Sequence, residues 1–286
     1  MPVTARSERR ELGWPSPVLL WSIVIGVPVA LVSANVWPLL LRGLGAPIGS
    51  VAEGIFLLVF LWWAAGGGPP RTTRVARSTA FRTVALAPSQ WAWSLLAAIG
   101  FAVAVHATIV LLFRLMPFPA EAFRQGYDFS FIRTRPLQWL AVVMSAASAG
   151  VCEETGFRGY MQRPIELRHG PSPAIVVSSL LFMLLHLTKG WALIGMVPIV
   201  LGAGALLGLL AWASGSLIPG IIGHTLMDVG LFGFWWTGIA GDFTARPIQE
   251  TGVDGFFLVA CLTLTIAVCV VWFAIRRLLL LRRRTT

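Results

Sequence analysis

Charged residues are scarce in this sequence of 286 residues, of which 12% are Asp, Glu, Lys or Arg and 57% are hydrophobic. A soluble domain carries about 25% charged residues. With so few charges, the chain cannot cover the water-facing surface of a soluble protein of this size. The composition, with a mean hydropathy of +0.79, therefore predicts a surface that is covered mostly by lipid.

Cysteine is also rare, with only Cys152, Cys261 and Cys269, all in or beside apolar runs. An odd number without short spacings supports neither a disulfide framework nor a cysteine-based metal site. The GxSxG motif of many serine hydrolases is absent, and Cys152 lacks the local sequence of a nucleophile. These absences disfavour a covalent route of hydrolysis and favour activated water.

Lysine is almost missing: Lys189 is the one lysine among 22 basic residues, and the formal net charge is +10. The basic residues are dispersed among hydrophobic runs, which argues against a nucleic-acid partner. Their excess is typical of the cytoplasmic loops of a membrane protein. The preference for Arg over Lys indicates a GC-rich bacterial genome, and hence a multi-pass protein of a bacterial cell membrane.

Apolar runs are abundant, and a membrane-spanning helix needs about 20 mostly apolar residues. We predict an all-α, polytopic helical bundle of about eight spans, a single membrane domain over 1–286. Residues 1–136 would hold accessory spans and a cytoplasmic loop, 137–240 the core with the polar motifs, and 241–286 the last span and a basic tail. The expected spans are 17–41, 48–66, 91–116, 137–162, 172–187, 191–213, 216–240 and 255–281.

The basic residues predict the orientation of these spans. With the N-terminus inside, 15 basic residues lie on the cytoplasmic side and 7 elsewhere. This asymmetry follows the positive-inside rule. It predicts two cytoplasmic termini and an even number of spans, which six spans would also satisfy.

Ionisable side chains within a span cost at least about 2.5–3.5 kcal/mol each at mid-bilayer, so they are candidates for function. They concentrate in three motifs between 153 and 228. In the first, Glu154 and Arg158 are spaced i, i+4 and can pair on a helix. Glu153 is rotated from Glu154 by about 100° and can face elsewhere.

The second motif is Phe182-x-x-x-His186, and the third is His224-x-x-x-Asp228, whose two polar residues share one helical face. That spacing suits two ligands of one metal ion, or an Asp that orients an imidazole. Alone, each motif also has a plain interpretation as interfacial charge or as hydrogen-bonded helix packing. If these groups converge in the interior of one bundle, they can form hydrogen bonds and ion pairs with one another. If each is buried separately, each costs free energy as an unpaired polar group.

A carboxylate beside a histidine can act as a general base on water, and histidines with carboxylates can hold Zn²⁺, which lowers the pKa of bound water to about 7. In order and spacing, the three motifs resemble those of the CPBP family of membrane proteases, which includes CAAX proteases and bacteriocin-processing enzymes. The resemblance covers roughly 137–240. It implies an intramembrane endopeptidase that cleaves near the cytoplasmic face of the membrane.

The resemblance also implies roles for the polar residues, and Asp228 differs from the form of the third motif that ends in Asn. The third motif ends in Asn or Asp in the family, and an ionised Asp cannot donate a hydrogen bond to an oxyanion. Asp228 therefore favours a zinc site, with Glu153, His186, His224 and Asp228 as expected ligands. The implied roles are water activation by Glu153 and His186, ordering of the site by Glu154 and Arg158, and oxyanion stabilisation or metal binding by His224 and Asp228.

One difficulty and two alternatives accompany this interpretation. On straight helices, Glu153 and His186 would differ in depth by roughly 10–15 Å. The chain could instead be a non-catalytic scaffold or regulator with the family fold, or a transporter that uses these residues for protons or cations. For a protease, we expect a peptide or membrane-protein substrate within the lipid bilayer, and the sequence leaves the oligomeric state open.

Overall fold

The computed structural model describes residues 16–82, 84–117, 121, 129–187, 191–241 and 246–283, without the side chains of 191–193. All regular secondary structure within these ranges is helical, as expected. The elements are α1 (Pro17–Ala30), α2 (Val32–Ala64), η1 (Arg71–Thr73), α3 (Arg74–Ala80), α4 (Pro88–Leu115), α6 (Arg135–Glu154), η2 (Thr155–Gln162), α7 (Arg163–His169), α8 (Pro171–Leu187), η3 (Trp191–Met196), α9 (Val197–Ser214), α10 (Ile218–Gly230), η4 (Leu231–Trp236), α11 (Ile248–Thr251) and α12 (Gly255–Arg282).

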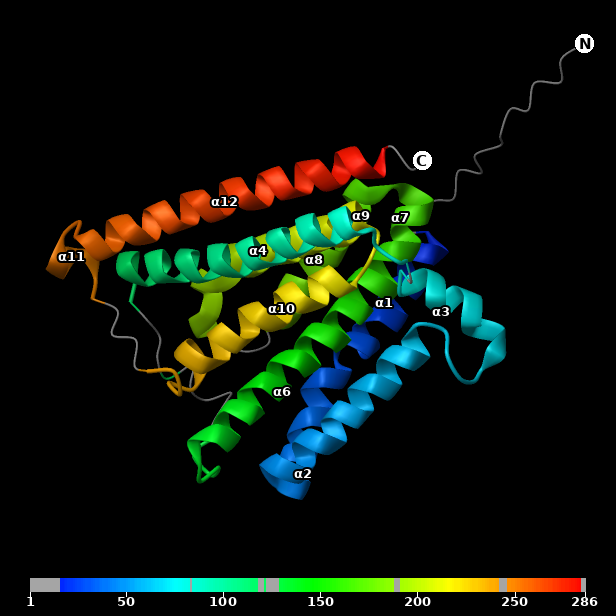
Figure 1. Cartoon of the computed structure of the whole chain (residues 1–286), viewed down its shortest axis with the longest axis horizontal. Coiled ribbons are helices and arrows are strands. Elements are labelled where there is room, and N and C mark those ends of the chain that lie inside the picture. Colours follow the sequence, from blue (N-terminus) through cyan, green and yellow to red (C-terminus); the bar gives the residue numbers. More distant parts are fainter. Residues whose placement is uncertain are drawn as a thin grey trace, which may run out of the picture.

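The long helices run back and forth between two ends of one bundle (Figure 1). Helix α10 packs against α6 and α4, α12 lies along α4, and α8 pairs with α9. On the other side of α6, α2 lies along that helix, and α1 packs against η2. The arrangement places α6, α8 and α10, which carry the three polar motifs, among neighbouring helices in the interior.

Helix α2 is two helical arms joined at Gly45. This glycine has φ 74° and ψ 166°, a backbone conformation that residues with a side chain rarely adopt. A Cβ atom on Gly49 would lie 2.8 Å from the carbonyl oxygen of Leu40, although nine residues of straight helix would separate the two positions by about 13.5 Å. The chain therefore turns back at Gly45, which keeps the expected spans 17–41 and 48–66 as separate segments (Figure 1).

Four stretches among the described residues are long and apolar enough to cross a membrane: Pro17–Ala64, Pro88–Leu115, Ile194–Ser214 and Gly255–Arg282. On α12, large apolar side chains such as Leu262 and Trp272 are 60% exposed, which suits contact with lipid. The all-α, polytopic membrane class is thus confirmed. The number of eight spans and the cytoplasmic location of the termini stay predictions, and residues 1–15 and 284–286 lie outside the described ranges.

The first and last described helices begin and end at the same end of the bundle (Figure 1). The hydroxyl of Ser16 lies 2.8 Å from His169 Nε2 at the end of α7. Arg282 donates to the carbonyl oxygen of Trp212 near the end of α9. Most of the described arginines outside the site also lie at this end, which is therefore the end that the positive-inside rule predicts to face the cytoplasm.

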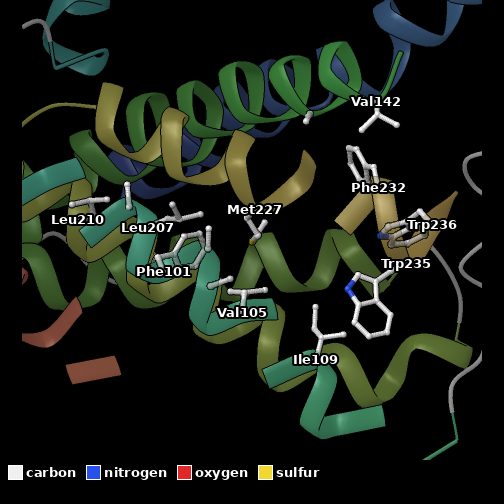
Figure 2. Packing of buried hydrophobic residues seen from close by; sticks show 14 of the residues in the cluster. Phe101, Val105, Ile109, Val142, Leu207, Leu210, Met227, Phe232, Trp235 and Trp236 are labelled. Atoms are coloured by element: carbon white, nitrogen blue, oxygen red, sulfur yellow. The ribbon is translucent and has the colours of Figure 1, made fainter. Parts of the chain in front are cut away.

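The largest apolar core lies between α4, α9, α10 and η4. Figure 2 shows Phe101 and Val105 of α4 directed toward Met227 of α10, Ile109 of α4 beside Trp235, and Val142 of α6 near Phe232. This core continues into the wall of the cavity described next, because several of its residues line that cavity.

Candidate active site

The first motif spans the point where α6 passes into η2, a helix with the wide π-type turn. Arg158 Nη1 donates to Glu154 Oε1 at 2.7 Å, which is the pairing that the i, i+4 spacing predicted. Both side chains are wholly buried. Two side chains bind backbone carbonyls of η2: Ser178 Oγ donates to Phe157 O at 3.1 Å, and Arg82 Nε donates to Arg158 O at 3.4 Å. These contacts hold the irregular turn that positions Arg158.

The Glu154 carboxylate also binds the third motif. His224 Nδ1 donates to the same oxygen, Oε1, at 2.9 Å, so one carboxylate joins a guanidinium and an imidazole from different helices. This link between residues 70 positions apart could not be read from helical spacing. Burial of the carboxylate is compensated by these two donors, as a buried charge requires.

Two glycines of α9 bring backbone carbonyls close to the first motif. Arg158 Nη2 donates to Gly204 O at 3.1 Å, and Gln162 Nε2 donates to Gly208 O at 2.9 Å. A Cβ atom on Gly208 would lie 2.7 Å from Gln162 Oε1. The Gly204-x-x-x-Gly208 pair thus allows close approach of η2 to α9, and it also exposes two hydrogen-bond acceptors to polar side chains from η2.

His224 lies between two carboxylates. Its Nδ1 atom bonds to Glu154, and its Nε2 atom is 3.5 Å from Asp228 Oδ2. The second distance exceeds the usual hydrogen-bond range of about 2.7–3.2 Å. Asp228 therefore acts on His224 mainly through charge in this arrangement, and both residues line the cavity.

The ring of Phe182 packs against three polar groups of the site. The guanidinium carbon of Arg158 lies 4.5 Å from the ring centroid, and the rings of His186 and His224 have centroids 4.4 and 5.9 Å from it. Phe182 is 2% exposed. The aromatic residue of the second motif thus fixes the relative positions of charged groups from the other two motifs.

His186 donates from Nδ1 to the carbonyl oxygen of Phe182 at 2.8 Å. A carbonyl oxygen can only accept, so Nδ1 carries a proton, and in the neutral ring Nε2 carries the lone pair. Such a ring can act as a base through Nε2.

One cavity, with about 860 Å³ of space including its mouth, brings together four of the six expected site residues. Glu153, His186, His224 and Asp228 all line it, although straight helices would place the first two at different depths. Oε2 of Glu153 is buried there without a hydrogen-bond partner among the described residues. The rest of the lining is apolar and includes Phe182, Met183, Met196, Met227, Phe232 and Trp236.

The arrangement does not form a zinc site among the described residues. No group of three or more His, Cys, Asp or Glu is placed there to hold a metal ion. Both ring nitrogens of His224 face carboxylates, and Glu154 Oε1 already accepts from Arg158. A zinc ion would have to displace one of these contacts, so the expected zinc remains a prediction.

Sequence reasoning missed one buried acidic residue near these motifs, Glu53, and it gave His106 of the expected span 91–116 only as an outside candidate for the site. Glu53 of α2 is wholly buried, and its signal was present: an ionisable residue within the expected span 48–66. His106 of α4 has Nε2 3.1 Å from the carbonyl oxygen of Met227, next to Asp228. A Cβ atom on Gly230 would lie 2.3 Å from that same nitrogen, so the ring of His106 occupies the space which that glycine leaves.

The comparisons with known proteins agree with the motifs. The family model described as "Type II CAAX prenyl endopeptidase Rce1-like" matches residues 134–230, about the region of the sequence resemblance. No curated protein and no solved structure matches the chain. The matched segment holds all six expected site residues, and it includes α6, α8, η3, α9 and α10 among the elements that line the cavity. Residues 134–230, about a third of the 286-residue chain, thus resemble an Rce1-like domain.

Proposed function

We propose that the chain hydrolyses a peptide bond inside the membrane with a water molecule activated by Glu153 and His186. The observation that carries this proposal is the cavity, in which two carboxylates and two imidazoles from three helices meet within an otherwise apolar wall. The alternative of a non-catalytic scaffold would have gained support if the motif residues had not converged, whereas four of them line this one cavity. Peptide or membrane-protein substrates of a bacterial cell membrane fit this setting.

In the proposed reaction, Glu153 takes a proton from water as the water oxygen attacks the carbonyl carbon of the scissile bond. The Oε2 atom of Glu153, buried without a partner among the described residues, supports this role. His186 accepts a hydrogen bond from the same water through Nε2, since Nδ1 is held by Phe182 O.

The attack leaves a negative charge on the former carbonyl oxygen, and His224 is placed to stabilise it. With acceptors beside both nitrogens, the ring can donate on both sides as an imidazolium. Preorganised positive charge of this kind stabilises an oxyanion without reorganisation. The proton on Glu153 then passes to the leaving nitrogen as the carbon–nitrogen bond breaks.

Glu154 and Arg158 hold this arrangement from behind the cavity. Neither lines it, and both are wholly buried. Glu154 fixes the His224 ring, and Arg158 ties Glu154 to the backbone of Gly204. Since Glu153 lies in the last turn of α6, at the arginine-rich end of the bundle, cleavage would take place near the cytoplasmic face of the membrane.

The test uses the full chain in lipid vesicles with a library of apolar peptides, and it compares wild type with Glu153→Gln and Glu250→Gln. Loss of a general base reduces the rate by about 10²–10⁴-fold, so Glu153→Gln should lose at least about 100-fold with an unchanged melting temperature. Glu250 lies on α11, is exposed and serves as the matched control. Equal cleavage by all three proteins would contradict the proposal.

A further inference from the structure

Glu53 is a wholly buried acidic residue in the second arm of α2, outside the cavity. It follows the turn at Gly45 by eight residues and precedes the end of the helix at Ala64 by eleven. At about 1.5 Å per residue, it lies some 12 and 16 Å from these two points. The carboxyl group is therefore deep within the membrane-spanning part of the bundle.

Neither oxygen of this carboxyl group has a hydrogen-bond partner among the described residues, and no ion pair to it is formed there. Ser148 and Cys152 of α6, about one turn apart, lie beside it. The Ser148 hydroxyl is buried and also lacks a hydrogen-bond partner in the described part of the chain. The remaining contact between these helices is apolar and includes Leu57 and Val151.

Glu154 provides a direct comparison, because it is equally buried one helix away. It accepts hydrogen bonds from Arg158 and His224, which compensate its negative charge. Among the described residues Glu53 has no cationic donor beside it, and its polar neighbour on α6 is the neutral hydroxyl of Ser148. An ionised carboxylate without a partner in an apolar interior is so unfavourable that such a group neutralises instead, and intramembrane acidic residues commonly mark sites of proton binding.

We propose that Glu53 is a proton-binding site, which holds a proton while α2 is packed against α6. The ligand is a single proton, and the neutral carboxyl group fits the apolar contact with Ser148 and Cys152. Loss of the proton requires separation of α2 from α6 or entry of water. Cys152 precedes Glu153 in the chain, so the same turn of α6 contacts this site on one face and the cavity on the other.

The site can be tested on the full chain in lipid vesicles, independently of any peptidase activity. A protonated carboxyl group has a carbonyl infrared band distinct from the bands of carboxylates. Wild type at neutral pH should show this band, Glu53→Gln should lose it, and the exposed control Glu250→Gln should keep it. Absence of the band from wild type, or its survival in Glu53→Gln, would overturn the proposal.

Chemical labelling keeps the proposal testable if Glu53→Gln fails to fold. A hydrophobic carbodiimide adds to protonated carboxyl groups within membranes, and peptide mass mapping locates the adduct. We expect the adduct on Glu53 of the wild type and none on Glu250. A wild-type protein that is labelled on neither residue, or on Glu250 alone, would refute a protonated Glu53.

A third measurement is the thermal stability of Glu53→Leu. Replacement of an unpaired polar group by an apolar one of similar size is neutral or stabilising, so the melting temperature should stay the same or rise. A clear fall would indicate an ionised, paired Glu53 and would contradict the proposal.

Discussion

Glu154 accepts a hydrogen bond from His224 at 2.9 Å, between Oε1 and Nδ1. The two residues come from the first and third motifs and lie on α6 and α10. Because the same oxygen also accepts from Arg158, the His224 ring is tied through Glu154 to η2 and, through Arg158, to the backbone of α9. The position of this catalytic candidate thus depends on a carboxylate that does not reach the cavity.

Glu154→Gln should therefore destabilise the fold more than Glu153→Gln does. The first change leaves Arg158 buried without its carboxylate, and removal of one partner of a buried ion pair costs about 3–5 kcal/mol. Glu153 has no ion pair among the described residues, so its amide should be tolerated. Thermal unfolding in detergent measures both variants, and equal melting temperatures would show that these roles are assigned wrongly.

Arg158→Lys should fail to replace arginine. The guanidinium contacts Glu154 and Gly204 O together and lies 4.5 Å from the centroid of Phe182, whereas an ammonium group is a single point charge. A buried acceptor left unpaired costs about 1–3 kcal/mol. We expect a loss of stability of that size and reduced peptide cleavage, with exposed Arg168→Lys as the unaffected control. Wild-type behaviour of Arg158→Lys would contradict a dual role of the guanidinium.

Helical spacing predicted the contacts within a single turn and missed those between helices. The Glu154–Arg158 pair and the approach of His224 to Asp228 both follow from i, i+4 positions. The bond from Glu154 to His224 depends on how α6 packs against α10, which local sequence does not encode. The expected depth difference between Glu153 and His186 assumed straight spans, yet both line one cavity.

Opposite ends of α12 should lie on opposite sides of the membrane. Its 28 residues extend about 42 Å, which exceeds the roughly 30 Å thickness of the hydrocarbon core. Reporter fusions after residue 286 should be cytoplasmic, and fusions within 241–253 should be on the other side. If both positions report the same side, the eight-span topology is wrong.

Asp254 should stabilise the start of α12 in a pH-dependent manner. Its carboxylate accepts from the backbone N–H of Phe257 at 2.8 Å and pairs with Arg114 at 3.1 Å, and these contacts lower the pKa of Asp254 below its usual value. A lowered pKa means that the stabilisation is present above about pH 4, the unfolded value, and is lost as the pH falls below it. Asparagine also caps helices but carries no charge. Wild type should melt higher than Asp254→Asn at neutral pH, and the difference should shrink in acid; a difference independent of pH would contradict this assignment.

Asp228→Asn distinguishes a metal-free site from the zinc site that the sequence predicted. In the structure, Asp228 faces Nε2 of His224 at 3.5 Å, and the described residues form no set of three metal ligands. In this arrangement the new amide can donate to an oxygen in the cavity, so we expect the variant to keep its activity in excess chelator. If zinc is required, the same change removes an expected ligand and should weaken zinc binding by about 10-fold or more, the scale seen when even supporting groups are lost. Metal analysis of the purified protein, combined with peptide cleavage with and without chelator, measures both effects. Stoichiometric zinc together with loss of wild-type activity in chelator would establish the zinc site and reject the metal-free arrangement.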